Sequence, residues 1–363
     1  MSYQLQYRRH ELQFKFDART SRGSLTTHPV YYLQLSATED PEVKGWGEAA
    51  PLAGLSVDHK PEFEGKLADF CRTFNKQNHS VLEAVETWFK HQDLVNWPAL
   101  KFGFETALLD LKNGGRKLLF DTTFSRGETG IPINGLIWMG DEAFMQEQIQ
   151  QKLEQGYNCL KLKIGGLDFK TECGILSAIR KVAKGDKLTI RLDANGAFKP
   201  EEALQKLETL ARYDIHSIEQ PIKQNQPFEM RNICLNSPIP IALDEELIGV
   251  NSPVKRRGLL QYIQPQFIIL KPTLIGGFAD CRKWISLAEE RKIGWWITSA
   301  LESNIGLNAI AQFTSTFRNL MPQGLGTGQL YHNNIPSPLT IKNGQLFYET
   351  SAGWQTDNLF PED

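Results

Sequence analysis

Cysteine, histidine and long apolar runs are all scarce in this chain of 363 residues. The five cysteines form an odd number and include no CxxC pair, which favours reduced packing residues in a cytoplasmic protein over a disulfide framework. No apolar run approaches the roughly 20 residues that span a bilayer. The N-terminus alternates apolar and polar residues, whereas a signal peptide has a continuous apolar core. We therefore expect neither a membrane segment nor an export signal.

An excess of charge of one sign is also lacking. Lysine and arginine total 40, aspartate and glutamate total 42, and the formal net charge is −2. Such a chain carries no uniform field that would select nucleic acid or an anionic membrane. Its 41% apolar and 23% charged residues are ordinary globular values, which exclude disorder, collagen and coiled coil as descriptions of the whole chain. A soluble enzyme or a binding protein is left.

From about residue 130 onward, short apolar strands alternate with amphipathic helical stretches at a steady interval. The residues chosen near the successive strand ends are Asn134, Lys163, Asp193, Glu219, Asp244, Lys271, Ser299 and Thr327. Eight strand–helix units at this spacing predict an α/β fold with a (β/α)8-type barrel of about 200 residues. A doubly wound sheet is the competitor, but the Gly-rich dinucleotide turn typical of it is missing.

The remaining segments predict three parts in the chain. Residues 1–128 combine two opening strands and a third near 31–35 with helical stretches around 61–74, 80–90 and 99–113, a pattern typical of an α+β capping domain. Residues 129–328 form the predicted barrel. The segment 329–363 is too short to fold alone, so we expect it to pack back on the cap or the barrel and complete the cap.

Ionisable side chains stand at five consecutive strand ends. In a barrel, catalytic groups collect at the C-terminal ends of the strands. An ionisable group at the end of a buried strand is costly unless it is paired or binds a metal. A single carboxylate at such a place more often caps a helix or pairs with a lysine. Three carboxylates in succession, Asp193, Glu219 and Asp244, instead predict one metal site.

Oxygen-only ligation by these three carboxylates suits a hard divalent cation. Mg²⁺ prefers such donors and keeps positions open for substrate, whereas Zn²⁺ prefers nitrogen and sulfur. Mn²⁺ accepts the same ligands. Of the seven histidines only His216 falls within residues 130–330, so a histidine-built metal site cannot be assembled there. We expect Mg²⁺, with Mn²⁺ as a second possibility.

Lysines flank the predicted metal site. Period-two alternation places Lys161 and Lys163 on one face of their strand, and Arg191 and Asp193 on one face of the next. Lys161 and Arg191 would lower the pKa of Lys163 and leave it able to accept a proton. Lys271 enters from the opposite side as a second acid or base or as a fixed positive charge. Pairing of Lys161 and Lys163 with surface carboxylates is the plainer alternative.

A metal between two lysines matches the removal of a proton α to a carboxylate, because the cation stabilises the developing enediolate while a lysine takes the proton. The residues that carry this pattern resemble the enolase superfamily, muconate-lactonising subgroup. The matching motifs are KLK at 161–163, LDAN at 192–195, IEQP at 218–221, ALDE at 242–245 and LKPTLIGG at 270–277. Upstream, GWGEAAPL at 45–52 resembles the cap-domain loop that closes over the barrel mouth. INGLIWMG at 133–140 and SALESNIG at 299–306 resemble the o-succinylbenzoate synthase branch.

The resemblance implies roles for these positions. Asp193, Glu219 and Asp244 match the metal ligands, Lys163 matches the base, and Lys271 matches the lysine that stabilises the enediolate. In the o-succinylbenzoate synthase branch, the proton beside the carboxylate of a hydroxy-cyclohexadiene leaves to Lys163. The neighbouring hydroxyl then departs as water, a dehydration in menaquinone biosynthesis, and Lys163 is able to return its proton to that group.

Other residues are candidates for binding or support. Asn195 matches the LDAN motif and either supports the metal site or is a plain turn residue. Ser299, Ser303 and Asn304, together with Arg191, are candidates to bind the substrate, although Ser/Asn clusters often cap the next helix. Loops at 22–24 and 52–56 would cover the substrate and set specificity, but their composition also fits plain loop mobility.

Two other functions must be considered beside this one. An N-succinylamino acid racemase or dipeptide epimerase would use the same site, with both lysines transferring protons from opposite faces. A catalytically idle binding barrel would be expected to lose at least one carboxylate or lysine, whereas all five are present. The expected partner is a small-molecule carboxylate, and the sequence does not indicate an oligomeric state.

Overall fold

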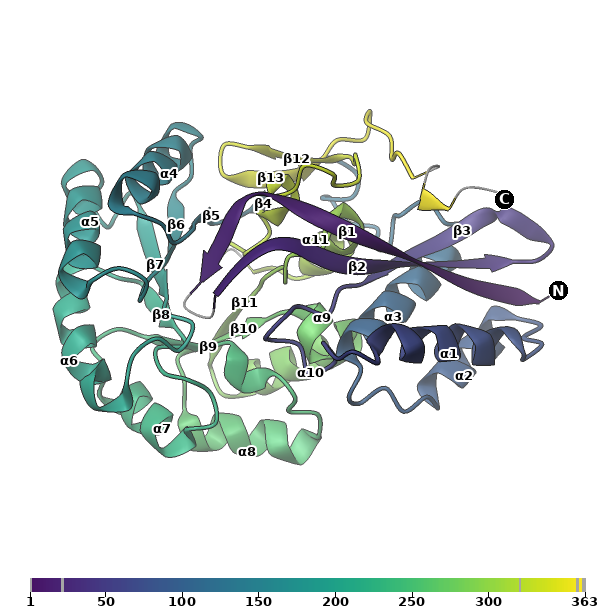
Figure 1. Ribbon diagram of the computed structural model, residues 1–363, viewed down its shortest axis with the longest axis horizontal. Helices are drawn as coiled ribbons and strands as arrows, with labels where there is room; N and C mark the ends of the chain where they lie inside the picture. Colours follow the sequence, from purple (N-terminus) through teal and green to yellow (C-terminus); the bar gives the residue numbers. More distant parts are fainter. Residues whose placement is uncertain (1, 21–22, 320, 357–358, 361–363) are drawn as a thin grey trace.

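A computed structural model describes residues 2–20, 23–319, 321–356 and 359–360 of the chain. The N-terminal strands and helices lie at one side of the molecule and the helix-lined barrel at the other (Figure 1). The long β1–β2 hairpin runs from the first part toward the second. Arg22, predicted to lie in a covering loop, is outside the described residues.

The N-terminal part is an antiparallel sheet with helices packed on it. Its strands, in the order β1-β2-β3, are β1 (Tyr3–Thr20), β2 (Gly23–Ala37) and β3 (Asp40–Ala49). Its helices are α1 (Phe63–Asn75), α2 (Leu82–Lys90) and α3 (Pro98–Lys112), close to the predicted stretches. The two predicted opening strands are one continuous strand, because pairing with β2 runs without a register shift from Tyr3 to Gln13. A register shift follows between Gln13 and Ala18.

Close packing fixes β3 against α3. A Cβ atom added to Gly47 would lie 1.9 Å from the carbonyl oxygen of Gly103, and one added to Gly45 would lie 2.1 Å from that of Ala107. Only glycine allows the strand and helix backbones to approach so closely. The end of β3 is therefore held firmly where the chain leaves the sheet toward the barrel.

The barrel contains seven parallel strands in the spatial order β11-β10-β9-β8-β7-β6-β5. These strands are β5 (Gly135–Ile137), β6 (Cys159–Lys163), β7 (Thr189–Asp193), β8 (Ser217–Glu219), β9 (Ile241–Leu243), β10 (Phe267–Leu270) and β11 (Gly294–Ile297). The α-helices are α4 (Glu142–Glu154), α5 (Phe169–Val182), α6 (Pro200–Leu210), α7 (Pro227–Asn236), α8 (Pro253–Ile263), α9 (Pro272–Ile275), α10 (Gly277–Glu290) and α11 (Asn304–Thr314). Short 3-10 helices are η1 (Ala211–Tyr213), η2 (Glu245–Leu247) and η3 (Thr327–Gln329). The predicted (β/α)8-type barrel with an N-terminal capping domain is confirmed in architecture.

The first and eighth barrel positions differ from the predicted units. Residues 131–132, expected in the first strand, form β4 (Ile131–Pro132) and pair with a C-terminal strand, so the barrel strand β5 begins after Asn134. The eighth position is filled by two residues: Gln323 bridges to Ile133 and Gly324 bridges to Thr298, each in parallel. The 3-10 helix η3 follows in place of an eighth α-helix.

The C-terminal segment contacts both larger parts. Strands β12 (Leu339–Lys342) and β13 (Gln345–Tyr348) form a small antiparallel sheet with β4 in the order β12-β13-β4. Just before them, the backbone N–H of Lys15 in β1 donates to the carbonyl of Leu330 at 2.9 Å. The domain boundaries at 128 and 328 stay a prediction.

Within the described ranges, no helix is both long and apolar enough to cross a membrane.

Candidate active site

Parallel strand register brings the predicted charged residues to one edge of the barrel. Lys163 lies opposite Asp193 across β6 and β7, and Asp193 lies opposite Glu219 across β7 and β8. Asp244 and Lys271 directly follow β9 and β10. Each of these five residues is at most 8% exposed. The strand spacing thus gathers the groups as the alternation predicted.

Lysines and carboxylates alternate within this cluster. The Lys161 Nζ atom lies 2.9 Å from Asp193 Oδ2 and 2.5 Å from Glu219 Oε2. Lys163 Nζ lies 2.7 Å from Asp193 Oδ2. Lys271 forms an ion pair with Asp244, and its Nζ atom lies 3.9 Å from Glu219 Oε1. Because every charge has an opposite neighbour, the cluster avoids the cost of burying an unpaired ion. The alternative that Lys161 and Lys163 pair with surface carboxylates is wrong.

The two lysines on opposite sides differ in protonation tendency. Burial lowers the pKa of Lys163, and the nearby charge of Lys161 lowers it further against the opposing effect of Asp193. Burial also lowers the pKa of Lys271, but the carboxylate of Asp244 outweighs it and the net shift is upward. The sequence predicted a lowered pKa for Lys163, and the direction agrees, but the main cause of the lowering is burial and not the neighbouring positive charges. Lys163 is therefore the easier of the two to deprotonate.

The carboxylates have the donor chemistry of a site for a hard cation. Asp193, Glu219 and Asp244 come from three neighbouring strands and offer only oxygen. Apart from its ion pairs with Lys161 and Lys271, the carboxylate of Glu219 has no hydrogen-bond donor within the described residues. In those same ranges, no three His, Cys, Asp or Glu side chains are gathered closely enough to hold an ion as they stand. Lys161 lies between two of the carboxylates, as the distances above show.

Asn195 supports this cluster through three hydrogen bonds. Its φ of 44° is left-handed, a conformation that asparagine tolerates better than most residues. Its side-chain oxygen accepts from Lys163 Nζ at 2.8 Å, and its amide donates to Glu245 Oε1 at 3.2 Å. Its backbone N–H donates to Asp193 Oδ1 at 3.0 Å. Asn195 is thus more than a plain turn residue, because it orients both Lys163 and Asp193.

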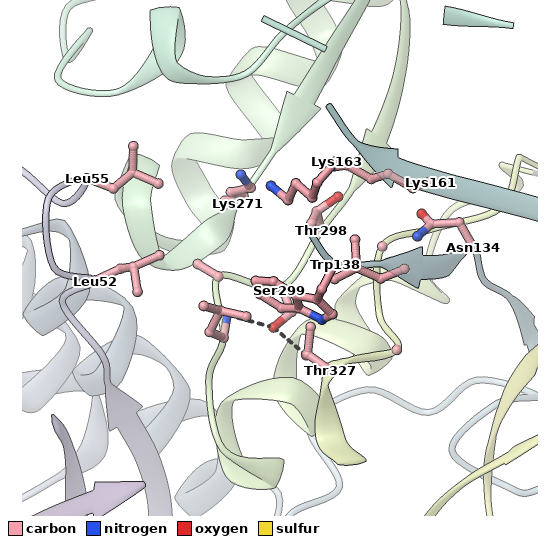
Figure 2. Close-up of a pocket in the computed structure, with 15 residues that line it drawn as sticks. Leu52, Leu55, Asn134, Trp138, Lys161, Lys163, Lys271, Thr298, Ser299 and Thr327 are labelled. Atoms are coloured by element: carbon pink, nitrogen blue, oxygen red, sulfur yellow. Dashed lines mark hydrogen bonds between the residues drawn. The ribbon is translucent and has the colours of Figure 1, made fainter. Parts of the chain in front are cut away.

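A pocket opens above the lysines. Figure 2 shows the ends of Lys163 and Lys271 close together, with Leu52 and Leu55 on one side of the cavity and Trp138 on the other. The full lining is Leu52, Leu55, Asn134, Leu136, Trp138, Lys161, Lys163, Lys271, Thr298, Ser299, Ala300, Leu301, Gly324, Gly326 and Thr327. The capping-domain loop predicted at 52–56 therefore contributes to the pocket wall. Apolar walls around a few cations suit a largely apolar carboxylate.

Of the four predicted substrate-binding residues, only Ser299 lines this pocket. Arg191 lies in the barrel core, where its guanidinium stacks 4.0 Å from the centre of the Trp296 ring and donates to the carbonyl of Pro322 at 2.7 Å. The alternation correctly turned Arg191 inward. It did not show that the side chain packs on Trp296 and bonds Pro322 instead of lining the pocket.

Ser303 and Asn304 have structural partners instead of lining the pocket. Ser303 is the N-cap of α11, where its hydroxyl oxygen accepts from the N–H of Ile305. Asn304 donates from its side chain to the carbonyl of Ile335 at 2.6 Å and so ties α11 to the C-terminal segment. The helix-capping alternative is correct for Ser303.

Two buried carboxylates near the pocket were not predicted as site residues. Glu302 accepts hydrogen bonds from the Ser299 hydroxyl at 2.5 Å, from the Ala300 N–H at 2.7 Å and from Thr273. Glu48 accepts from the first turn of α11, and burial raises its pKa to about 7. Both residues are 0% exposed. Glu48 is the penultimate residue of β3, and Glu302 lies in the loop after β11. Strand alternation does not indicate what either side chain contacts.

Known proteins resemble this chain over most of its length. Residues 144–355 match the model of the enolase C-terminal domain-like family. The chain is 48% identical to an o-succinylbenzoate synthase of Desulfotalea psychrophila, over 94% of this chain and 98% of that protein. A crystal structure of MenC from Desulfotalea psychrophila superposes with a TM-score of 0.85 and 46% identity, covering 96% of this chain and 100% of that one. An L-Ala-D/L-Glu epimerase of Bacillus subtilis is 25% identical over 87% of this chain and 84% of that protein. With the motifs and the barrel site described above, these matches show that the chain belongs to the enolase C-terminal domain-like family.

Proposed function

We propose that this chain is an o-succinylbenzoate synthase, a carbon–oxygen lyase of menaquinone biosynthesis. It removes water from 2-succinyl-6-hydroxy-2,4-cyclohexadiene-1-carboxylate and leaves o-succinylbenzoate. The observation that carries the proposal is the 48% identity to a protein of that name over 94% of the chain. The convergence of three carboxylates and two opposed lysines at the pocket supplies the chemistry that this reaction needs.

Lys163 is the proposed base. In its neutral form it takes the proton from the ring carbon beside the carboxylate, and burial of its ammonium favours that form. The neighbouring carbon–oxygen bond then breaks, and Lys163 returns the proton to the departing hydroxyl, so water leaves and the lysine is restored. The ring gains a double bond and becomes aromatic. Lys271 keeps its proton and places a fixed positive charge near the planar enediolate.

A divalent cation, Mg²⁺ with Mn²⁺ as an alternative, is proposed to bind Asp193, Glu219 and Asp244. Bound there, it would supply positive charge against the substrate carboxylate and the enediolate. Glu219 supports the assignment, because within the described residues its carboxylate has no donor other than the ammonium groups of Lys161 and Lys271. Lys161, which lies between Asp193 and Glu219, is proposed to balance the charge of the carboxylates, and Asn195 to orient Lys163.

Ser299 keeps its proposed role beside the succinyl group because it lines the pocket. Its hydroxyl donates to Glu302, and its oxygen accepts from the Leu301 N–H at 3.1 Å and from the Thr327 hydroxyl at 2.8 Å. A hydrogen bond from Ser299 to the substrate would therefore replace one of these contacts. The proposed partner is a small-molecule carboxylate, and the proposed location is the cytoplasm.

A side-by-side assay tests this function. Purified protein is given the cyclohexadiene or an N-succinylamino acid, each with Mg²⁺ and with a chelator. We expect rapid Mg²⁺-dependent formation of the aromatic product and little or no racemisation. The second candidate, racemisation or epimerisation, is favoured by the ends of Lys163 and Lys271 lying close together in the pocket (Figure 2) and by the 25% identical epimerase. Racemisation without dehydration would establish it instead.

A further inference from the structure

Glu48 connects the capping domain to the barrel. It stands near the end of β3 and is 0% exposed. Its carboxylate accepts hydrogen bonds from the Ser303 N–H at 2.7 Å, the Ser303 hydroxyl at 2.5 Å and the Gly306 N–H at 2.7 Å. All three donors belong to the N-terminal turn of α11, whose dipole also favours a negative charge.

Both ends of this connection lead into the pocket wall. Leu52 and Leu55 follow Glu48 in the chain, and both line the pocket. On the barrel side, the lining residues Ser299 and Leu301 belong to the loop that leads into Ser303. Figure 2 shows Leu52 and Ser299 on adjoining sides of the same cavity. One carboxylate therefore fastens two loops that come from different parts of the chain.

The neighbouring backbone is shaped for this contact. A Cβ atom added to Gly306 would lie 3.0 Å from Glu48 Oε2 and 2.7 Å from the Cβ atom of Glu302. A side chain at residue 306 would therefore push the carboxylate away. On the other side, close packing of Gly47 on α3 holds the strand that carries Glu48. The contact is thus made between two elements that are each held in place.

We propose that Glu48 is a positioning residue that holds the loop carrying Leu52 and Leu55 closed over the pocket. This inference rests on the proposed function, because it assigns Glu48 to substrate binding in that reaction. Glu48 contacts neither lysine and lies outside the pocket lining, so it acts through the loop. If the loop is closed in only a fraction of the molecules, the apparent substrate affinity is the intrinsic affinity multiplied by that fraction. The chemistry at Lys163 is then unchanged.

Glu48→Gln in the full chain tests the proposal. Glutamine keeps the size of the side chain but offers one acceptor oxygen, so at least one of the three donors loses its partner. We expect KM for the cyclohexadiene to rise about tenfold, with kcat within about threefold of wild type. Backbone amides of residues 49–56 should exchange hydrogen faster by about the same factor, measured by mass spectrometry without substrate.

Glu105→Gln is the matched control. Glu105 in α3 accepts from the N–H groups of Phe278 at 2.6 Å and Ala279 at 3.1 Å, so it also links the cap to the start of a barrel helix. None of these three residues lines the pocket. Its variant should lose stability but keep the wild-type KM and the wild-type exchange at residues 49–56.

Ser303→Ala removes one of the three donors and should shift KM and exchange in the same direction by a smaller factor, which keeps the test decisive if Glu48→Gln does not fold. The proposal is overturned if the Glu48 and Glu105 variants change KM and exchange equally, or if the Glu48 variant lowers kcat alone. Failure of wild-type protein to convert the cyclohexadiene would refute the proposed function. The exchange experiment would still decide whether Glu48 holds the loop.

Discussion

At the scale of single residues, Lys163 and Lys271 face one pocket with opposite protonation tendencies. Replacing Lys163 with alanine removes the proposed base, and general acid–base catalysis contributes roughly 10²–10⁴-fold to rate. We therefore expect dehydration of the cyclohexadiene to fall by at least about 10²-fold while the circular dichroism spectrum stays native. Turnover near the wild-type value would remove Lys163 as the base.

Lys271→Arg distinguishes the two candidate reactions. Arginine keeps a positive charge but does not release its proton in proteins, so it cannot serve as a second base. The synthase should retain measurable dehydration, whereas any racemisation of an N-succinylamino acid should disappear. Both activities are measured on the same preparation. Loss of dehydration to the level of the Lys163 variant would contradict the fixed-charge role.

Asp58 should make stability depend on pH. Burial raises the pKa of this carboxyl from 3.8 to about 7, although the N–H of Ala99 donates to it at 2.8 Å. A raised acid pKa means that the folded state prefers the protonated form, so its contribution is complete below pH 3.8 and is lost as pH rises through about 7. Asp58→Asn keeps an acceptor and removes the titration.

The expected result for Asp58 is a difference that changes with pH. The free energy of unfolding of wild type minus that of Asp58→Asn should fall by roughly 1–4 kcal/mol between pH 4 and pH 8. Urea unfolding at several pH values measures it. A difference independent of pH would show that Asp58 titrates alike in the folded and unfolded chains.

The sequence located the site residues that a local strand pattern constrains and missed those that long-range contacts place. Alternation in a parallel strand fixes which side chains point inward, so the sequence predicted the cluster of Lys163, Asp193 and Glu219. Alternation did not show which inward side chains reach the pocket: Lys161 lines it, whereas Arg191, opposite Lys161 in register, packs on Trp296. The contacts of Glu48 and Ser303 are made between segments 255 positions apart, which no local pattern encodes.

At the scale of elements, helices and long strands were predicted better than barrel closure. Amphipathic periodicity located α1, α2 and α3 within a few residues. The eighth position of the barrel is formed by isolated backbone bridges of Gln323 and Gly324. The sequence there has no apolar run long enough to predict a strand. Proline-bearing β4 likewise joined the small C-terminal sheet, because pairing with β13 depends on residues more than 200 positions away.

Gln323→Ala tests how the barrel is closed. The Gln323 side-chain oxygen accepts from the Ile297 N–H at 2.8 Å, and its amide donates to the carbonyl of Met321 at 2.6 Å. The side chain is 1% exposed, so the lost partners are not replaced by water. We expect a loss of about 1–3 kcal/mol in the free energy of unfolding, measured in urea. Gln323→Glu, which keeps the acceptor for Ile297 but not the donor, should not restore full stability.

At the scale of the whole molecule, a net charge of −2 conceals three lysines and three carboxylates buried at one barrel mouth. A divalent cation that binds only the folded chain stabilises it by mass action, by about 2.7 kcal/mol at a free concentration 100 times Kd. Mg²⁺ should therefore raise the melting temperature of wild-type protein, and a chelator should reverse the rise.

Asp244→Asn separates metal binding from general salt effects. This change removes one proposed ligand and the ion-pair partner of Lys271, so the starting melting temperature should fall. The informative quantity is the further shift caused by Mg²⁺ in each protein, measured against NaCl of equal ionic strength. We expect a clear shift in wild type and a much smaller one in Asp244→Asn, because two carboxylates bind the ion more weakly than three. Equal shifts in the two proteins would place the stabilising ion elsewhere and separate the three carboxylates from metal binding.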